Sequence, residues 1–235
     1  MLSIEDVTVR RGNKEVVRSF SLQVNPGEVT ALLGANGAGK SSLVLALAGR
    51  LPVSGGAVTL DGAKINGLRP NRVRRAGLAA VPEGHKVLGS MTVHDNILAA
   101  ILETHRESAI VDEVFEVFPE LAGLSEQQAG AISGGQQQML AIAQALASDP
   151  KYLLIDELSL GLAPIIVARL APVLAEIAKG GVGVLLIEQF ATVALAISRR
   201  AAVMDRGELA WLGEAVELAD NPEVLHGVYL GGSVA

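Results

Sequence analysis

The stretch Gly34-Ala35-Asn36-Gly37-Ala38-Gly39-Lys40-Ser41-Ser42 decides the fold of this chain. It fits G-x-x-x-x-G-K-S/T, the pattern of the phosphate-binding P-loop. An apolar run typical of a buried strand, residues 29–33, precedes it, and a run that favours a helix, residues 41–48, follows it. The loop is therefore expected at a helix N-terminus, where unpaired backbone N–H groups and the helix dipole attract an anion.

The motif also assigns roles to its residues. Its glycines let the backbone wrap closely around phosphate. Lys40 is expected to reach the β- and γ-phosphates of ATP, and the Ser41 hydroxyl to bind Mg²⁺. The other expected nucleotide contacts are Asn36, Gly37, Ala38, Gly39 and Ser42. The alternative is a glycine-rich turn that matches by chance, which the flanking strand and helix make rarer.

Composition limits the class of protein. The 235 residues suffice for one large domain or for a domain with an inserted lobe. The absence of cysteine excludes disulfides and cysteine-bound metals, and it suits a reducing cytosol. The net charge of −6 argues against nucleic acid as a partner. The basic cluster is accordingly interpreted as a solvated face rather than a phosphate site; it comprises Arg69, Arg72, Arg74 and Arg75.

No stretch of the sequence has the length of a membrane span. Residues 1–6 lack the pattern of a signal peptide. The longest apolar runs, such as residues 182–187, fall far short of the roughly 20 residues that a spanning helix needs. The chain is not expected to cross a membrane alone.

The order of apolar patterns predicts an α/β fold. Strands are expected within residues 2–32 and at 57–61, 77–81, 152–156, 182–187, 201–205 and 208–212. Helical patterns dominate residues 84–150, including one from Thr92 through Leu102, and another helix opens at Pro164. Alternating strands and helices favour a mostly parallel sheet that is covered on both faces. We therefore expect a catalytic α/β core of residues 1–83 and 151–235, with residues 84–150 inserted as a helical lobe.

Two acids follow the apolar strand at 152–156. Ligand sites of parallel sheets lie at the carboxyl ends of the strands, which is where Asp156 and Glu157 are expected. Asp156 would hold Mg²⁺, usually through water, and Glu157 would orient the attacking water. The alternative is that the two acids only terminate the strand.

A second anion site is suggested by Ile132-Ser133-Gly134-Gly135-Gln136. Ser133 is a natural N-cap, and the glycines leave backbone N–H groups open. A plain capped helix start is the alternative. One chain does not need two γ-phosphate sites, but a head-to-tail dimer does. In such a dimer, Ser133, Gly135 and Gln136 would cover the nucleotide of the partner.

Together these motifs resemble the ATPase subunits of ABC transporters over nearly the whole chain. Further stretches resemble the second, shorter ATPase of high-affinity branched-chain amino acid importers; they are residues 34–40, 81–84, 91–93, 137–142, 159–164, 187–189 and Tyr229-Leu230-Gly231-Gly232. The resemblance implies a RecA-like P-loop core with an N-terminal antiparallel β subdomain. It also implies transmembrane permease subunits as partners, a dimer with itself or a sister ATPase, and an indirect role for an extracytoplasmic solute-binding protein. The location that it implies is peripheral, on the cytoplasmic face of the membrane.

Several positions depart from the general ABC pattern. Glu83 replaces the usual Gln and could still reach Mg²⁺ or its water. Gln189 replaces the usual switch His and cannot carry a proton, and Arg11 replaces the adenine-stacking aromatic, although a guanidinium can also stack. Leu158 stands where Pro normally follows the catalytic Glu, and Ile132 replaces Leu. Gln189 and Leu158 affect the expected hydrolysis rate rather than nucleotide binding.

Residues 84–91 contain apolar side chains that are expected to be exposed. They form either a plain connecting loop or, as the resemblance implies, a docking groove for a cytoplasmic helix of the permease. His85 is interpreted as a loop residue, because four scattered histidines give no metal-ligand spacing.

Three functions follow in order of support. The first is a Mg²⁺-dependent ATPase that powers an importer. The second is a nucleotide-gated module that turns over little and pairs with a more active sister ATPase. The third, a non-transport ABC protein acting on DNA or ribosomes, is disfavoured by the acidic charge and the single cassette. Urea, amides and aromatic acids stay open as cargo beside branched-chain amino acids.

Overall fold

The protein has two sheets in the computed structural model, which describes residues 1–84, 87–102 and 104–229. The first is antiparallel, with strand order β2-β1-β4-β5. Its strands are β1 (Leu2–Arg11), β2 (Lys14–Val24), β4 (Val53–Leu60) and β5 (Ala63–Lys64). The pairing of β2 with β1 shifts register between Ile4 and Arg10. The expected N-terminal antiparallel subdomain is confirmed.

The second sheet carries the P-loop. Its strand order is β10-β9-β3-β8-β7-β6, and all neighbours are parallel except β10 and β9. The strands are β3 (Val29–Leu33), β6 (Leu78–Val81), β7 (Tyr152–Asp156), β8 (Gly183–Glu188), β9 (Arg200–Asp205) and β10 (Glu208–Glu214). β3, β7 and β8 are buried along their whole length, because both faces of this sheet are covered. The expected mostly parallel sheet is confirmed.

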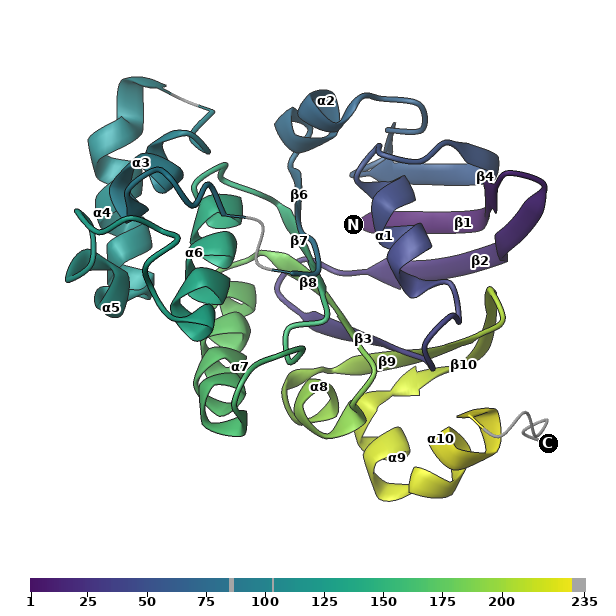
Figure 1. Cartoon of the computed structure of the whole chain (residues 1–235). Coiled ribbons are helices and arrows are strands. Elements are labelled where there is room, and N and C mark those ends of the chain that lie inside the picture. Colours follow the sequence, from purple (N-terminus) through teal and green to yellow (C-terminus); the bar gives the residue numbers. More distant parts are fainter. Residues whose placement is uncertain (85–86, 103, 230–235) are drawn as a thin grey trace.

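Two hydrophobic clusters cover the two faces of the parallel sheet. On one face, helix α1 (Lys40–Leu47) packs between the sheet and the antiparallel strands, with Leu32, Leu43 and Leu185 in one cluster. On the other face, helices cover the alternate strand residues, such as Leu33 and Leu186. Figure 1 shows α1 on the side of the antiparallel sheet and the long helices α6 and α7 on the other.

The helices between β6 and β7 gather at one side of the molecule (Figure 1). They are α3 (Val93–Leu98), a 3₁₀ turn at Thr104–Arg106, α4 (Glu107–Val117), α5 (Pro119–Ala122) and α6 (Gly134–Leu146). Their buried side chains share one cluster with the parallel sheet, so this segment packs onto the core. The helix expected through Leu102 was wrong in length. It ends at Leu98, because the N–H groups of Ala100 and Ile101 bond three residues back and tighten the last turn.

The remaining helices are α2 (Pro70–Arg75), α7 (Pro164–Lys179), α8 (Ala191–Ile197), α9 (Ala215–Asp220) and α10 (Pro222–Tyr229). Pro164 occupies the first turn of α7, as expected, and Pro172 lies inside the same helix. Among the helices described, none has the length and apolarity to cross a membrane. The sequence motif that begins at Tyr229 continues beyond the described residues.

One polar cluster connects the two sheets at the amino end of β7, the end opposite Asp156. Asp61, after β4, accepts hydrogen bonds from the Tyr152 hydroxyl at 2.8 Å and from Lys151 Nζ at 3.0 Å. The N-terminal ammonium of Met1 lies 2.5 Å from the same carboxylate. These three donors hold the pKa of Asp61 well below its ordinary value. The cluster connects β4 to the start of β7.

Candidate functional site

The P-loop is shaped by close contact with the antiparallel sheet. Gly39, the residue before α1, has φ +114°, a conformation that side chains disfavour. A Cβ at Gly39 would also lie 2.4 Å from the carbonyl oxygen of Val16 in β2. Only glycine fits here, and it has no side chain to cap the helix. The first N–H groups of α1 are therefore left for an anion.

Lys40 is almost fully buried, with 4% of its surface exposed. Its ammonium donates to the carbonyl oxygens of Gly34 at 2.7 Å and Ala35 at 3.3 Å. Burial lowers the pKa of Lys40, and the nearby charges led by Glu157 and Asp156 oppose this shift. The ammonium is thus folded back onto the loop, where phosphate oxygens could replace the two carbonyls.

Asp156 ends β7 next to the start of α1. The Ser41 side chain hydrogen-bonds to its carboxyl group, and burial raises the pKa of Asp156 to about 6, helped by the charges of Glu157 and Glu83. Its Oδ1 is buried and has no hydrogen-bond partner among the described residues. An unpartnered carboxylate oxygen beside a hydroxyl suits a hard divalent cation. The described residues contain no cluster of three acids or histidines that could hold a metal. Mg²⁺ would therefore need further oxygens from the nucleotide and water.

Glu157 lies in an unusual conformation beside this carboxylate. Its φ is +55°, and its N–H donates to the carbonyl oxygen of Ile187 at 2.9 Å. Glu83 is exposed in the turn after β6. The charges of Glu157 and Glu83 both act on Lys40 and on Asp156, so the structure brings these expected site residues to one edge of the sheet. Gln189 follows β8 directly and is half-buried.

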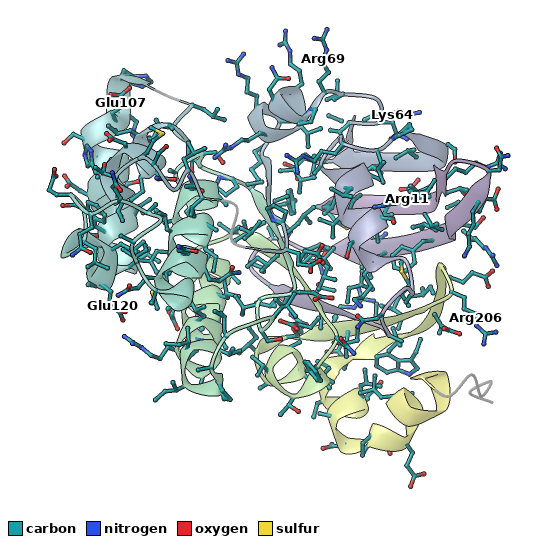
Figure 2. The ribbon with its side chains drawn as sticks, viewed as in Figure 1. Arg11, Lys64, Arg69, Glu107, Glu120 and Arg206 are labelled. Carbon is teal, nitrogen blue, oxygen red and sulfur yellow. The ribbon has the colours of Figure 1, made fainter. Side chains whose placement is uncertain are left out.

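Arg11 and Leu158 have definite places in the structure. Arg11 ends β1, and its Nε donates to Ser42 Oγ at 3.1 Å, so the guanidinium lies beside the P-loop helix (Figure 2). Leu158 has no exposed surface and belongs to the hydrophobic cluster under the parallel sheet. The residue that stands in place of Pro therefore serves packing.

The second anion motif is a complete capping box. Ser133 Oγ accepts from the Gln136 N–H at 3.3 Å, and Gln136 Oε1 accepts from the Ser133 N–H at 2.9 Å. Gly134 is open, whereas a Cβ on Gly135 would lie 2.9 Å from Cγ2 of Ile166 in α7. α6 and α1 belong to the clusters on opposite faces of the sheet. One chain therefore does not bring this motif onto its own P-loop.

One polar residue at the site was missed from the sequence. Glu188, the last residue of β8, is 1% exposed and accepts from the Ser159 N–H at 2.9 Å and from Ser159 Oγ at 2.8 Å. Burial raises its pKa, and the hydrogen bonds from Ser159 oppose the shift. The sequence does contain a signal for Glu188, because it is an acid at the end of an apolar strand, as Asp156 is. Its strand, β8, lies between β3 and β7.

A P-loop beside an acid pair, at the carboxyl edge of a parallel sheet, defines a nucleotide-hydrolysing cassette. The family model described as ABC transporter matches residues 17–159. The chain belongs to this family, as one of its ATP-binding, ATP-hydrolysing subunits. The chain is 40% identical, over 234 residues, to the high-affinity branched-chain amino acid transport ATP-binding protein BraG of Pseudomonas aeruginosa, which covers 99% of this chain and 100% of that protein.

Other relatives are more distant. The chain is 30% identical over 223 residues to the lipopolysaccharide export system ATP-binding protein LptB of Escherichia coli strain K12, with 93% of this chain and 92% of that protein covered. A crystal structure of the ADP conformation of an ATP-binding cassette of an ABC transporter aligns with a TM-score of 0.85 and 26% identity over 98% of both chains. These comparisons establish the fold and the ATPase class.

Proposed function

We propose that this chain is the Mg²⁺-dependent ATPase subunit of an importer for branched-chain or related amino acids. One observation supports the assignment as a Mg²⁺-dependent ATPase. Oδ1 of Asp156 has no partner among the described residues and lies beside Ser41, which follows the buried Lys40 of the P-loop. The cargo rests on similarity alone. The 40% identity to BraG extends over almost all of both chains, against 30% to LptB.

The site residues divide the work of hydrolysis. Lys40 and the backbone N–H groups of residues 37–42 hold the phosphates, and Arg11 lies where it could stack on the base. Ser41, Asp156 and Glu83 hold Mg²⁺, which neutralises phosphate charge when bound. Glu157 accepts a proton from the attacking water and orients it, and Gln189 supports this water by hydrogen bonding.

The second half of the site comes from a partner chain. We assign Ser133, Gly135 and Gln136 to the γ-phosphate of the partner, in a head-to-tail dimer with a second copy or a sister ATPase. The capping box presents the N-terminus of a 13-residue helix, where an anion is favoured. Closing and reopening of this dimer would move the helical segments and the membrane subunits attached to them.

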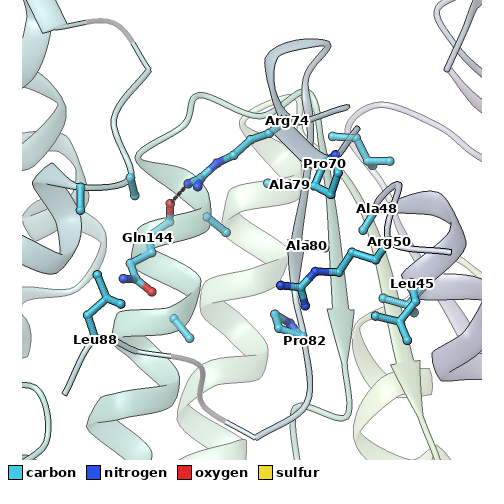
Figure 3. Close-up of a pocket in the computed structure, with 16 residues that line it drawn as sticks. Leu45, Ala48, Arg50, Pro70, Arg74, Ala79, Ala80, Pro82, Leu88 and Gln144 are labelled. Atoms are coloured by element: carbon cyan, nitrogen blue, oxygen red, sulfur yellow. Dashed lines mark hydrogen bonds between the residues drawn. The ribbon is translucent and has the colours of Figure 1, made fainter. Parts of the chain in front are cut away.

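The permease would dock in a cavity beside the P-loop helix. This cavity, about 380 Å³, lies between α1, α2, β6 and the helices α3 and α6 (Figure 3). Its walls are mostly apolar, and Leu88 of the expected docking loop lines it, whereas residues 85 and 86 lie outside the described part of the chain. A cytoplasmic helix of a permease fits such a groove. Docking there would place the chain on the cytoplasmic face of the membrane.

The four arginines at the N-cap and within α2 have two different environments. Arg69 points away from the body of the protein (Figure 2), and Arg72 and Arg75 are exposed as well. Arg74 is half-buried in the cavity wall, where its guanidinium donates to the carbonyl oxygen of Gln144 at 2.6 Å. The interpretation of the whole cluster as a solvated face was therefore wrong for Arg74.

Lys40→Ala tests the ATPase assignment. We expect loss of both ATP binding and turnover, because the alanine leaves the β- and γ-phosphates without their cation. Lys179→Ala, which removes an exposed lysine paired with Glu176, is the matched control. Full ATP turnover by Lys40→Ala would contradict the proposal. The low-turnover alternative rests on Gln189 and Leu158, and rapid Glu157-dependent hydrolysis by the isolated chain would contradict that alternative.

The cargo is tested separately in proteoliposomes. The chain, its permease subunits and its solute-binding protein are reconstituted, and ATP-driven uptake of labelled leucine is compared with uptake of urea, acetamide and phenylalanine. We expect leucine uptake that Lys40→Ala abolishes. Uptake of urea or acetamide without leucine would reassign the cargo and leave the ATPase assignment unchanged.

A further inference from the structure

Both carboxylate oxygens of Glu188 accept hydrogen bonds from one residue of the neighbouring loop. Oε1 accepts from the N–H of Ser159 at 2.9 Å, and Oε2 accepts from its hydroxyl at 2.8 Å. Only 1% of Glu188 is exposed. A buried carboxylate is costly unless its oxygens are well satisfied. The two Ser159 donors, together with the backbone N–H of Gln189, explain how the acid is tolerated.

A second contact holds the same loop one step earlier. The N–H of Glu157 donates to the carbonyl oxygen of Ile187, the residue before Glu188. Between the two contacts, Leu158 is fully buried in the core. The first and last residues of the segment 157–159 are therefore hydrogen-bonded to the end of β8, and its middle residue is buried in the core.

This fixation matters because Glu157 is held in an unfavourable backbone conformation. Its φ of +55° is disfavoured for any residue with a side chain and persists only where surrounding contacts enforce it. If the contact between Ser159 and Glu188 is lost, the turn can relax, and the Glu157 carboxylate leaves its place beside Lys40 and Asp156.

We propose that Glu188 is a positioning residue for ATP hydrolysis, which acts through Ser159 to hold the Glu157 carboxylate in its productive orientation. Glu188 does not touch the nucleotide in this role. The inference rests on the proposed function of Glu157 as the residue that orients the attacking water. Packing alone does not explain the acid, since an apolar residue would fill the same buried position at the end of β8.

The test compares catalytic rate with nucleotide affinity in the full chain. Glu188→Leu removes both acceptors, and Ser159→Ala removes one donor. We expect Glu188→Leu to lower kcat by about tenfold to a hundredfold, the range that misplacing a catalytic group costs. We expect Ser159→Ala to lower kcat by a smaller factor. The Kd for a fluorescent ATP analogue with Mg²⁺ should change by a smaller factor than kcat. The hydrogen bonds of Glu188 go to Ser159, and only its charge acts on Lys40 of the P-loop.

The conservative variant and the double variant sharpen the result. Glu188→Gln can still accept from the Ser159 N–H and can donate to its hydroxyl oxygen, so it should keep most of the rate. Adding Ser159→Ala to Glu188→Leu should cost little more, because the two residues act through one contact. Glu28→Leu is the matched control. It removes a carboxylate paired with Arg199 at the amino end of β3, the opposite edge of the sheet, and should leave kcat unchanged.

Amide hydrogen exchange gives a readout that is independent of turnover. The Ser159 N–H should exchange faster in Glu188→Leu, while the amides of β3 keep their protection. A wild-type rate in Glu188→Leu would overturn the positioning role alone. Equal loss of affinity and rate would also overturn it, since that indicates general disruption. If wild type is no faster than Glu157→Gln, the role of Glu157 fails and the role of Glu188 fails with it.

Discussion

Asp156→Asn should stabilise the nucleotide-free protein while destroying its function. The pKa of Asp156 is raised from 3.8 to about 6, chiefly because the carboxylate is buried. The folded state therefore holds this proton more tightly than the unfolded chain does, and ionising Asp156 destabilises the fold. The difference of roughly 2 pKa units corresponds to about 3 kcal/mol at neutral pH. Asparagine keeps the shape and an acceptor for Ser41 without the charge.

The pH dependence follows from the same two pKa values. Below the unfolded value of 3.8, Asp156 is protonated in both states, and the variant gains nothing from losing the charge. As pH rises from the unfolded value of 3.8 to the folded value of about 6, wild type loses stability relative to the variant, and above the folded value the difference is complete. The stabilising effect of Asp156→Asn should therefore grow from about 0.5 kcal/mol at pH 4 to about 3 kcal/mol at pH 8.

Urea unfolding of both proteins between pH 4 and pH 8, without nucleotide or Mg²⁺, measures this difference. Subtracting the two curves removes the contribution of every other titrating group. Asp112→Asn, at an exposed position of α4, controls for the change in net charge. A wild type that is more stable than the variant at pH 8, or a difference that does not depend on pH, would refute a destabilising buried charge at Asp156.

Two further predictions concern stability. Gly56→Ala should cost about 3 kcal/mol in urea unfolding, because the residue has φ +78° and a Cβ would lie 2.3 Å from the carbonyl oxygen of Asp6. Gly62→Ala, with φ +82° and open space around the Cβ, should cost only about 1 kcal/mol, and equal losses would contradict the steric account. Tyr152→Phe should cost about 1 kcal/mol by removing the bond to Asp61, with no change in ATP turnover. A slower ATPase in Tyr152→Phe would show that this edge of the sheet influences the site.

Most of the candidate site could be predicted from local patterns in the sequence. The P-loop and the acids Asp156 and Glu157 lie at strand ends, and strand ends can be found from apolar runs alone. The structure brings Lys40, Asp156 and Glu157 together at one edge of the sheet, as expected. Their roles in binding and hydrolysis stay predictions until variants are measured.

Contacts between residues far apart in the chain could not be predicted from the sequence. The bonds between Glu188 and Ser159 join residues 29 positions apart, and Tyr152 and Asp61 are 91 positions apart. Such pairs depend on strand order, which a single sequence does not reveal. Gly135 belongs to the expected anion site, and the structure adds a second reason for a glycine there, which is its close approach to Ile166.

In the proposed function, two ATPase subunits close head-to-tail over ATP, and two copies of this chain are the simplest such pair. Glu157→Gln should bind ATP without hydrolysing it, so the closed state should accumulate. Light scattering of this variant with and without ATP and Mg²⁺ measures the mass directly. We expect a monomer without nucleotide and a dimer with it, and adding Ser133→Arg should return the dimer to a monomer. A variant that binds ATP normally and stays monomeric would contradict a working composite site within this one chain.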